Sequence, residues 1–185
     1  MNEIVEESRR IAPLLASVIQ EVGERLTPGM TTREVNRLIV EGLNRHNLQP
    51  AMLGFNGFPT ESTIAINEQV LHVPPSDREL ALGDLVTIQS AAYSEKAFAN
   101  LGRTFAIGAI DDEKAKLLKT AAEALQKAIG TIRTGARTGD VSAAIQGHIE
   151  AAGFSVVRDY VGYAMGHRMM EDPQLLCFGR AGTGP

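Results

Sequence analysis

The stretch VTIQSAAYSEKAFANLGRTFAIG (86–108) decides the fold, because two β-rich segments flank a short polar turn. Apolar and β-branched residues alternate with small or polar ones on both sides of the turn, which predicts an antiparallel hairpin. Gln89 is expected at the end of the first strand, and Asn100 is expected inside the second. Two uncharged amides therefore occupy places where a hairpin of this shape often carries two carboxylates.

The composition favours one globular domain without a nucleic-acid or membrane role. The chain has 185 residues, of which 44% are hydrophobic, and its net charge is −4. A nucleic-acid partner would need a clustered basic face, and no apolar run reaches the length of a membrane span. The single cysteine, Cys177, excludes an internal disulfide and suits a reducing compartment. We therefore expect a soluble cytoplasmic protein, with Cys177 as an unreactive thiol on a late strand.

Outside the hairpin the chain follows a plan that repeats. Apolar residues at helical spacing predict a helix over 3–26, and Thr31 with Glu34 forms a capping-box pattern at the start of a second helix. A shift of 106 residues superposes the pairs Gly29 and Gly135, Thr32 and Thr138, Glu34 and Asp140, and Val35 and Val141. In the later helix, 111–132, the expected apolar stripe consists of Leu117, Leu118, Ala121, Leu125 and Ile129. The sequence thus predicts two related halves, each with a long helix before a shorter one.

Three segments, taken in chain order, carry motifs of one known protein family. GFNGFPTESTIAINEQVLHVPP (54–75) is similar to the family segment that contains an asparagine–glutamate pair and a histidine before a proline. LALGDLVTIQSAAYSEKAFANLGRTFAIG (80–108) resembles the family hairpin, and YVGYAMGHRMMEDPQ (160–174) resembles its glycine–histidine–glycine segment. Together the three segments resemble the methionine aminopeptidases of the creatinase/aminopeptidase family, and this resemblance covers the whole chain in order.

The resemblance implies an α+β protein with the pita-bread fold. In this fold two pseudo-twofold-related halves form a curved antiparallel sheet that helices cover. We expect a single domain over 1–185, with a first half of about 1–108 and a second half of about 109–185. Since the second half is the shorter one, its last strands are expected to be missing.

The resemblance also implies a dinuclear metal site, at which this chain differs. The two metal-binding aspartates of the family match Gln89 and Asn100, and the metal-binding histidine matches Tyr163. The two metal-binding glutamates match nothing before Pro185, and Glu171 matches a glutamate that is not a ligand. Hard divalent ions prefer anionic oxygens or imidazole, so we predict no metal and no other cofactor.

Part of the substrate side matches the family. His72 corresponds to a histidine near the scissile bond, which makes it a candidate catalytic residue or, alternatively, a structural histidine. The other residues predicted to line the cleft are Phe58, Thr63, Met165, His167, Met169, Met170 and Glu171. Of these, His167 is expected to face water.

The function predicted from these differences is non-catalytic. We expect a protein that has lost its metal site and acts in binding or regulation, through its cleft or an open sheet edge. The expected partner is a protein, a peptide or a second copy of the chain. Two alternatives stay open: a metal-independent, creatinase-like hydrolase that uses His72, and a metallo-aminopeptidase with a rearranged site.

Overall fold

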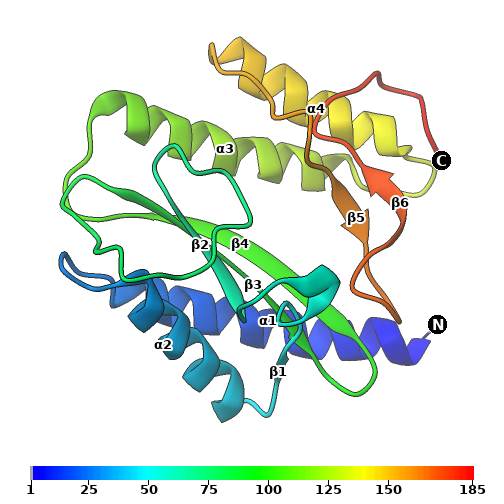
Figure 1. The fold of residues 1–185 in the computed structure, drawn as a ribbon. Coiled ribbons are helices and arrows are strands. Elements are labelled where there is room, and N and C mark those ends of the chain that lie inside the picture. The colour runs from blue at the N-terminus through cyan, green and yellow to red at the C-terminus, as the bar shows by residue number, and fades with distance from the viewer. Residues whose placement is uncertain (1) are drawn as a thin grey trace. The chain divides into compact units, whose positions relative to one another are not determined.

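A computed structural model of the chain describes residues 2–185 and divides them into two compact units (Figure 1). The first unit runs to Ile110 and also includes Met165–Met169, and the second comprises Asp111–Ala164 and Met170–Pro185. The first unit contains α1 (Asn2–Glu24), α2 (Thr32–Arg45), β1 (Gln49–Pro50), the 3-10 turn Phe55–Gly57, β2 (Ser62–Ile66), β3 (Leu85–Tyr93) and β4 (Phe98–Ala106). The second contains α3 (Asp112–Thr131), α4 (Thr138–Ala151), β5 (Gly162–Ala164) and β6 (Glu171–Leu175).

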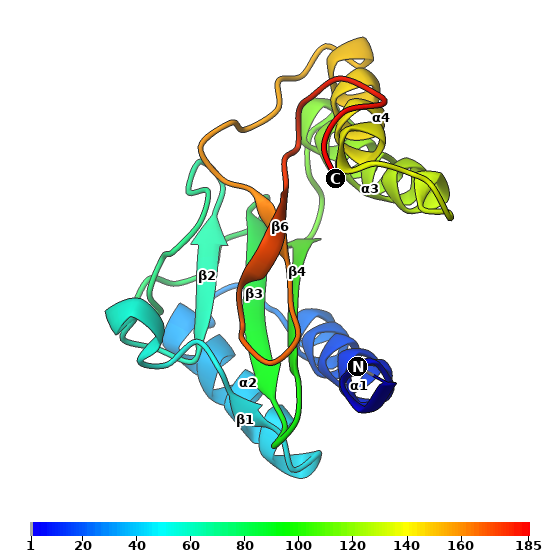
Figure 2. The same cartoon turned by 90° about the vertical axis from the view of Figure 1, so that its right-hand side faces the viewer.

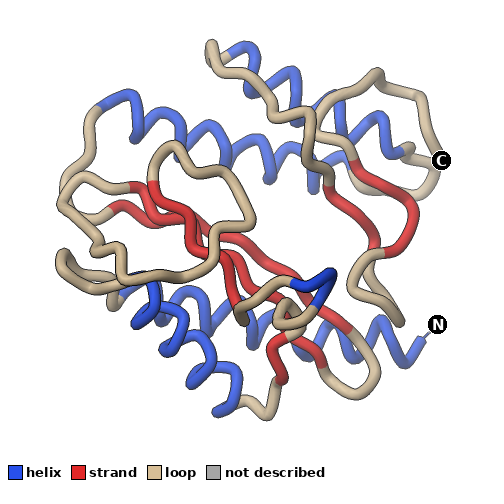
Figure 3. The backbone as a smooth tube through the Cα atoms, in the orientation of Figure 1, coloured by secondary structure: helices blue, strands red, loops and turns tan. Residues whose placement is uncertain are grey.

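The predicted hairpin is the centre of the first unit. β3 pairs antiparallel with β4 on one side and with β2 on the other, and short β1 also pairs with β3 (Figures 2 and 3). Gln89 was expected at the end of the first strand. It lies instead in the middle of β3, because the strand continues to Tyr93. Asn100 lies inside β4, as predicted.

Helices α1 and α2 cover one face of this sheet. The helical spacing in the sequence is confirmed: Leu15 and Val18 of α1 and Ile39 of α2 are fully buried, together with Ile88 of β3. Burial of such side chains is worth roughly 1.5–3 kcal/mol each, which makes this layer the main source of stability in the first unit.

The two helix–helix turns are alike in detail, as the repeat predicts. Gly29 and Gly135 both have a φ of +84°, a left-handed conformation that residues with a Cβ rarely adopt. The carboxylates of Glu34 and Asp140 each accept a hydrogen bond from the backbone N–H three residues earlier, at 2.7 and 2.9 Å. The same turn and the same backbone-to-carboxylate hydrogen bond therefore start α2 and α4, and at α2 the Thr31 hydroxyl also accepts from the Glu34 backbone N–H.

The apolar stripe expected on α3 is wrong. Leu125 and Ile129 are 57% and 51% exposed, whereas the buried positions of the helix are Thr120, Ala124 and Ala128. These three residues are small and lie four residues apart, so they form a narrow row that lets another element approach closely. α4 packs alongside α3 within the second unit (Figure 1).

The rest of the second unit is a two-stranded ribbon, in which β5 pairs antiparallel with β6. Cys177 was expected on a late strand, but it lies in a bend that follows β6. Burial raises the pKa of its thiol. Among residues 2–185 no helix is long and apolar enough to cross a membrane.

Candidate functional site

The face of the sheet opposite α1 and α2 is polar in its middle. Successive side chains of a strand point to opposite faces, and Val86 and Ile88 point into the helix-covered core. Thr87, Gln89 and Ala91 therefore point to the other face. Residues paired directly across antiparallel strands share a face, so Thr63 of β2 and Gly102 of β4 flank Gln89.

Gln89 and Asn100 form an amide pair on this face. The Gln89 Nε2 atom donates a hydrogen bond to the Asn100 Oδ1 atom at 3.2 Å. The Gln89 Oε1 atom is buried and has no hydrogen-bond partner among residues 2–185. A buried carbonyl without a donor is costly, typically about 1–3 kcal/mol, so this atom is the unsatisfied point of the site.

The surroundings of the amide pair are polar but uncharged. The hydroxyls of Thr87 and Thr104 are 2.8 Å apart, and the Thr63 hydroxyl accepts a hydrogen bond from the backbone N–H of Val73 at 2.8 Å. The positions of β2, β3 and β4 that share this face carry no lysine, arginine, aspartate or glutamate. On these three strands the face of the amide pair therefore carries threonine hydroxyls and no charged side chain.

An apolar cluster adjoins the amide pair in the same unit. Its buried members are Met52, Ala91 and Met169, and the partly buried residues packed against them are Ala51, Phe55, Phe58 and Phe98. Ala91 is the residue directly opposite Asn100 in the sheet. The polar and apolar parts of the site are thus joined through one pair of neighbouring residues.

His72 contacts the apolar cluster. Its ring stands edge-on to that of Phe58, with the ring centroids 6.2 Å apart and the planes inclined by 62°. Its φ is +57°, a strained value for a residue other than glycine, and such strain is frequent at functional sites. The side chain is exposed, so a molecule from solution can reach the imidazole.

The structure brings part of the predicted site together within the first unit. Phe58, Met169 and His72 meet at the cluster, as just described, and Gln89 contacts Asn100. In the segment that also provides Met169, Met165 is partly buried and His167 is exposed. The exposure of His167 agrees with its expected orientation to water.

The remaining predicted residues belong to the second unit. Tyr163 lies on β5 opposite Gln174, and Glu171 is the first residue of β6. Met170 is 44% exposed and is not a member of the apolar cluster.

Met52, Phe55 and Phe98 were not among the residues predicted from the sequence. One signal could have found Phe98, because it stands two residues before Asn100 on the same strand and must share its face. Met52 and Phe55 lie in the irregular segment after β1, where no strand or helix period indicates their direction.

The side chains at the positions that resemble metal ligands do not fit a carboxylate-held pair of metals. Gln89 and Asn100 offer neutral amides, and the N–H of Gln89 points at the Asn100 oxygen, where a cation between them would need acceptors. Among residues 2–185 no group of three or more His, Cys, Asp or Glu side chains could hold a metal ion.

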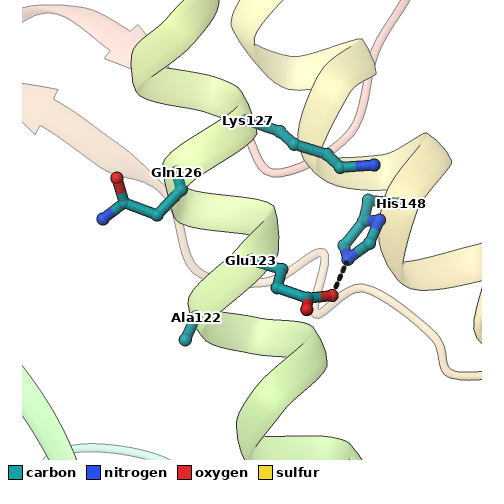
Figure 4. A pocket seen from close by; sticks show the side chains of 5 residues that line it. All are labelled: Ala122, Glu123, Gln126, Lys127 and His148. Carbon is teal, nitrogen blue, oxygen red and sulfur yellow. Dashed lines mark hydrogen bonds and ion pairs between the residues drawn. The ribbon is translucent and has the colours of Figure 1, made fainter.

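A shallow recess on the second unit has a different character. Ala122, Glu123, Gln126, Lys127 and His148 line it, and Figure 4 shows the side chains of Glu123 and His148 pointing toward each other from α3 and α4. The His148 Nε2 atom is 3.1 Å from a Glu123 carboxylate oxygen. This pair was not predicted from the sequence, because no spacing pattern relates residues that lie 25 positions apart on separate helices.

Comparisons with known proteins agree with the resemblance seen in the sequence. The model of "Metallopeptidase family M24" matches residues 6–183. The methionine aminopeptidase of Clostridium perfringens is 37% identical over 184 residues, which are 100% of this chain and 74% of that protein. The solved structure of methionine aminopeptidase from Thermotoga maritima superposes with a TM-score of 0.97 at 32% identity, and the match covers 100% of this chain and 75% of that one. The predicted resemblance and the pita-bread fold are both confirmed.

The same comparisons contradict the predicted function. Relatives that match nearly the whole chain, such as that of Clostridium acetobutylicum at 35% identity over 98% of this chain, are methionine aminopeptidases. Methionine aminopeptidases are enzymes, so the prediction of a non-catalytic binding or regulatory protein is wrong. The comparisons also give no support to the prediction that a metal site was lost.

Proposed function

Because the chain belongs to metallopeptidase family M24, we propose that it acts on the amino terminus of peptides and releases an apolar N-terminal residue, methionine first. The names of its relatives support this choice of reaction, since the identity of 37% extends over the full length of this chain. Hydrolysis at this position consumes one water and leaves a free amino acid and a peptide that is one residue shorter.

The observation that carries the proposal is the amide pair beside the apolar cluster. In the N-terminal residue of a peptide, the polar amino group and the side chain are attached to the same Cα atom, so they lie close together. The cluster of Met52, Ala91 and Met169 offers sulfur and methyl groups, and flexible methionine side chains adapt well to an apolar guest. Ala91 and Asn100 are direct neighbours across the two strands, so one residue of a ligand can span both parts.

Two residues of the first unit have proposed roles in binding and proton transfer. Phe58 packs against the apolar cluster and holds the ring of His72 edge-on. Since the imidazole is exposed and histidine is the side chain that most often serves as a general acid or base, we assign to His72 the transfer of a proton to the leaving amine. Binding of the apolar side chain next to His72 would place the scissile bond within its reach.

The test is release of methionine from the peptide Met-Ala-Ser, measured by chromatography with and without a chelator and with added Mn²⁺ or Co²⁺. We expect release by the wild type and at least a tenfold lower kcat/KM for Phe58→Ala, because truncation removes apolar contact. Leu53→Ala is the matched control, since Leu53 is apolar, lies in the same segment and is 51% exposed outside the cluster. It should leave the activity unchanged.

The variants also distinguish activity of this protein from that of a contaminating host peptidase, because a contaminant would be unaffected by Phe58→Ala and by His72→Ala. His72→Ala should lower kcat while KM changes little, because the imidazole is assigned to proton transfer and not to binding of the apolar side chain. Absence of methionine release under all metal conditions, or equal release by wild type and Phe58→Ala, would refute the proposed function.

A further inference from the structure

The turn after β1 contains an exposed asparagine that precedes a glycine. Asn56 lies in the 3-10 turn Phe55–Gly57 with a φ of +49° and a ψ of +31°, a left-handed conformation in which asparagine is more frequent than most other residues with a Cβ. Asn56 and Gly57 are both exposed. Among the asparagines of the sequence, only Asn56 is followed by glycine. Its side-chain amide therefore stands beside a backbone nitrogen that no neighbouring side chain hinders.

An asparagine in this position can lose its side-chain amide without an enzyme. The backbone nitrogen of Gly57 gives up its proton and attacks the Cγ atom of Asn56. A C–N bond forms, the bond between Cγ and Nδ2 breaks, and ammonia leaves with the proton, so that a succinimide ring remains. Water then opens the ring at one of its two carbonyls and leaves either aspartate or isoaspartate, in which the main chain runs through the side chain. Water is the only co-reactant, and no group is oxidised or reduced.

The geometry of the turn decides how readily this ring closes. Gly57 has no Cβ, so its nitrogen can approach the side chain of Asn56 without steric hindrance. The same nitrogen donates its N–H to the Gly54 carbonyl oxygen at 3.1 Å, and this hydrogen bond must open before the attack. Because Gly54 and Gly57 are exposed, water can replace the lost partner, so the opening costs little.

The turn also fixes the position of Phe58. The Gly54 N–H donates to the Phe58 carbonyl oxygen at 2.8 Å, and the Phe58 N–H donates to the Phe55 carbonyl oxygen at 2.9 Å. Phe55 and Phe58 both pack against the apolar cluster, and the Phe58 ring contacts that of His72. Isoaspartate adds one carbon atom to the main chain between the two phenylalanines, so the two hydrogen bonds cannot both keep their geometry.

From these observations we propose that Asn56 is a site of spontaneous deamidation, and that its isoaspartyl form opens the turn that holds Phe58 against the apolar cluster. The modification itself is independent of the proposed function, since it needs only the turn and water. Its effect on methionine release rests on the proposed function, because Phe58 is assigned there to binding of the apolar side chain.

Asn47 is a matched control inside the same chain. It is also exposed and has a φ of +54°, and the N–H of the following Leu48 is also hydrogen-bonded, to the Leu43 carbonyl oxygen at 3.0 Å. The difference is that Leu48 carries a branched side chain and is only 1% exposed. When the full chain is kept in mildly alkaline buffer and digested, mass spectrometry detects the gain in mass of each asparagine peptide. We expect Asn56 to convert at least about tenfold faster than Asn47, because Gly57 has no Cβ.

Two variants separate the charge of the product from the change in the main chain. Asn56→Gln should stay unmodified, since its longer side chain would have to close a six-membered ring. Asn56→Asp carries the negative charge on a main chain of normal length. Hydrogen exchange of the Gly54 and Phe58 amides, followed by NMR, should become faster in aged wild type and stay unchanged in Asn56→Gln aged in parallel. Freshly prepared Asn56→Asp should exchange as slowly as fresh wild type.

The outcomes distinguish this inference from the proposed function. Conversion of Asn56 no faster than that of Asn47 overturns the modification site, and unchanged exchange in the isoaspartyl form overturns its effect on the turn. Neither measurement uses peptidase activity, so both hold if Met-Ala-Ser is not hydrolysed and only the proposed function fails. If the fresh chain does release methionine, its kcat/KM should fall in proportion to the isoaspartyl fraction. Full activity of the isoaspartyl form would overturn the link between the turn and the apolar cluster.

Discussion

Two substitutions on α3 test the burial of this helix directly. Ala124 is 2% exposed, whereas Ala121, three residues earlier, is exposed. Ala124→Leu adds three carbon atoms to the row formed by Thr120, Ala124 and Ala128. Overpacking of this kind typically costs about 1–3 kcal/mol. Ala121→Leu adds the same atoms at an exposed position, where the expected change is within about 0.5 kcal/mol.

The two variants have the same composition, so the difference between their stabilities reports only the surroundings of positions 124 and 121. In a domain of this size roughly 1 kcal/mol shifts Tm by about 2–4 °C, which predicts a fall of roughly 2–12 °C for Ala124→Leu. Thermal unfolding followed by circular dichroism measures the shift, and hydrogen exchange of the α3 amides assigns it to the second unit. The apolar period of the sequence places Ala121 on the buried stripe. A larger loss of stability for Ala121→Leu than for Ala124→Leu would therefore refute the packing described here.

Three further predictions concern a cap, a carboxylate and the thiol. Thr31→Ala removes the side chain that accepts from the Glu34 backbone N–H at 3.2 Å, and it should lower the free energy of unfolding by about 1 kcal/mol in urea titration; no loss would contradict the role of the cap. A hydrogen bond from Arg10, followed by one with Ser94, lowers the pKa of Glu7 to about 2 from 4.5. Because the folded-state pKa is depressed, this contribution to stability is present above pH 4.5 and is lost as the pH falls towards 2. Glu7→Gln should reduce the pH dependence of the urea unfolding midpoint over this interval. An unchanged pH dependence would count against the pairing of Glu7 with Arg10. Burial raises the pKa of the Cys177 thiol, so iodoacetamide should modify the native chain at pH 7 much more slowly than the urea-unfolded chain; equal rates would show that the thiol is accessible.

The fold was predictable where local sequence signals and burial agree. The helical period of α1 and α2, the capping box at Thr31 and the hairpin of β3 and β4 all appear as expected. The hairpin has two strongly alternating strands, and a slip of one residue would move every apolar side chain out of the core. On α3 the same kind of period failed, because a helix period identifies an apolar side but not whether another element covers it.

The sequence by itself determined the family and the chemical identity of the side chains on the sheet. It placed uncharged amides at Gln89 and Asn100 and a histidine at His72, and these identities do not depend on folding. A sequence nevertheless contains no distances. Only the tertiary structure decided that the Gln89 N–H donates to Asn100 and that the opposite oxygen of Gln89 is buried without a donor. The reason is that strand pairing, and not position along the chain, brings two residues 11 positions apart into contact. The same pairing determines that the Gln89 oxygen is left without a donor.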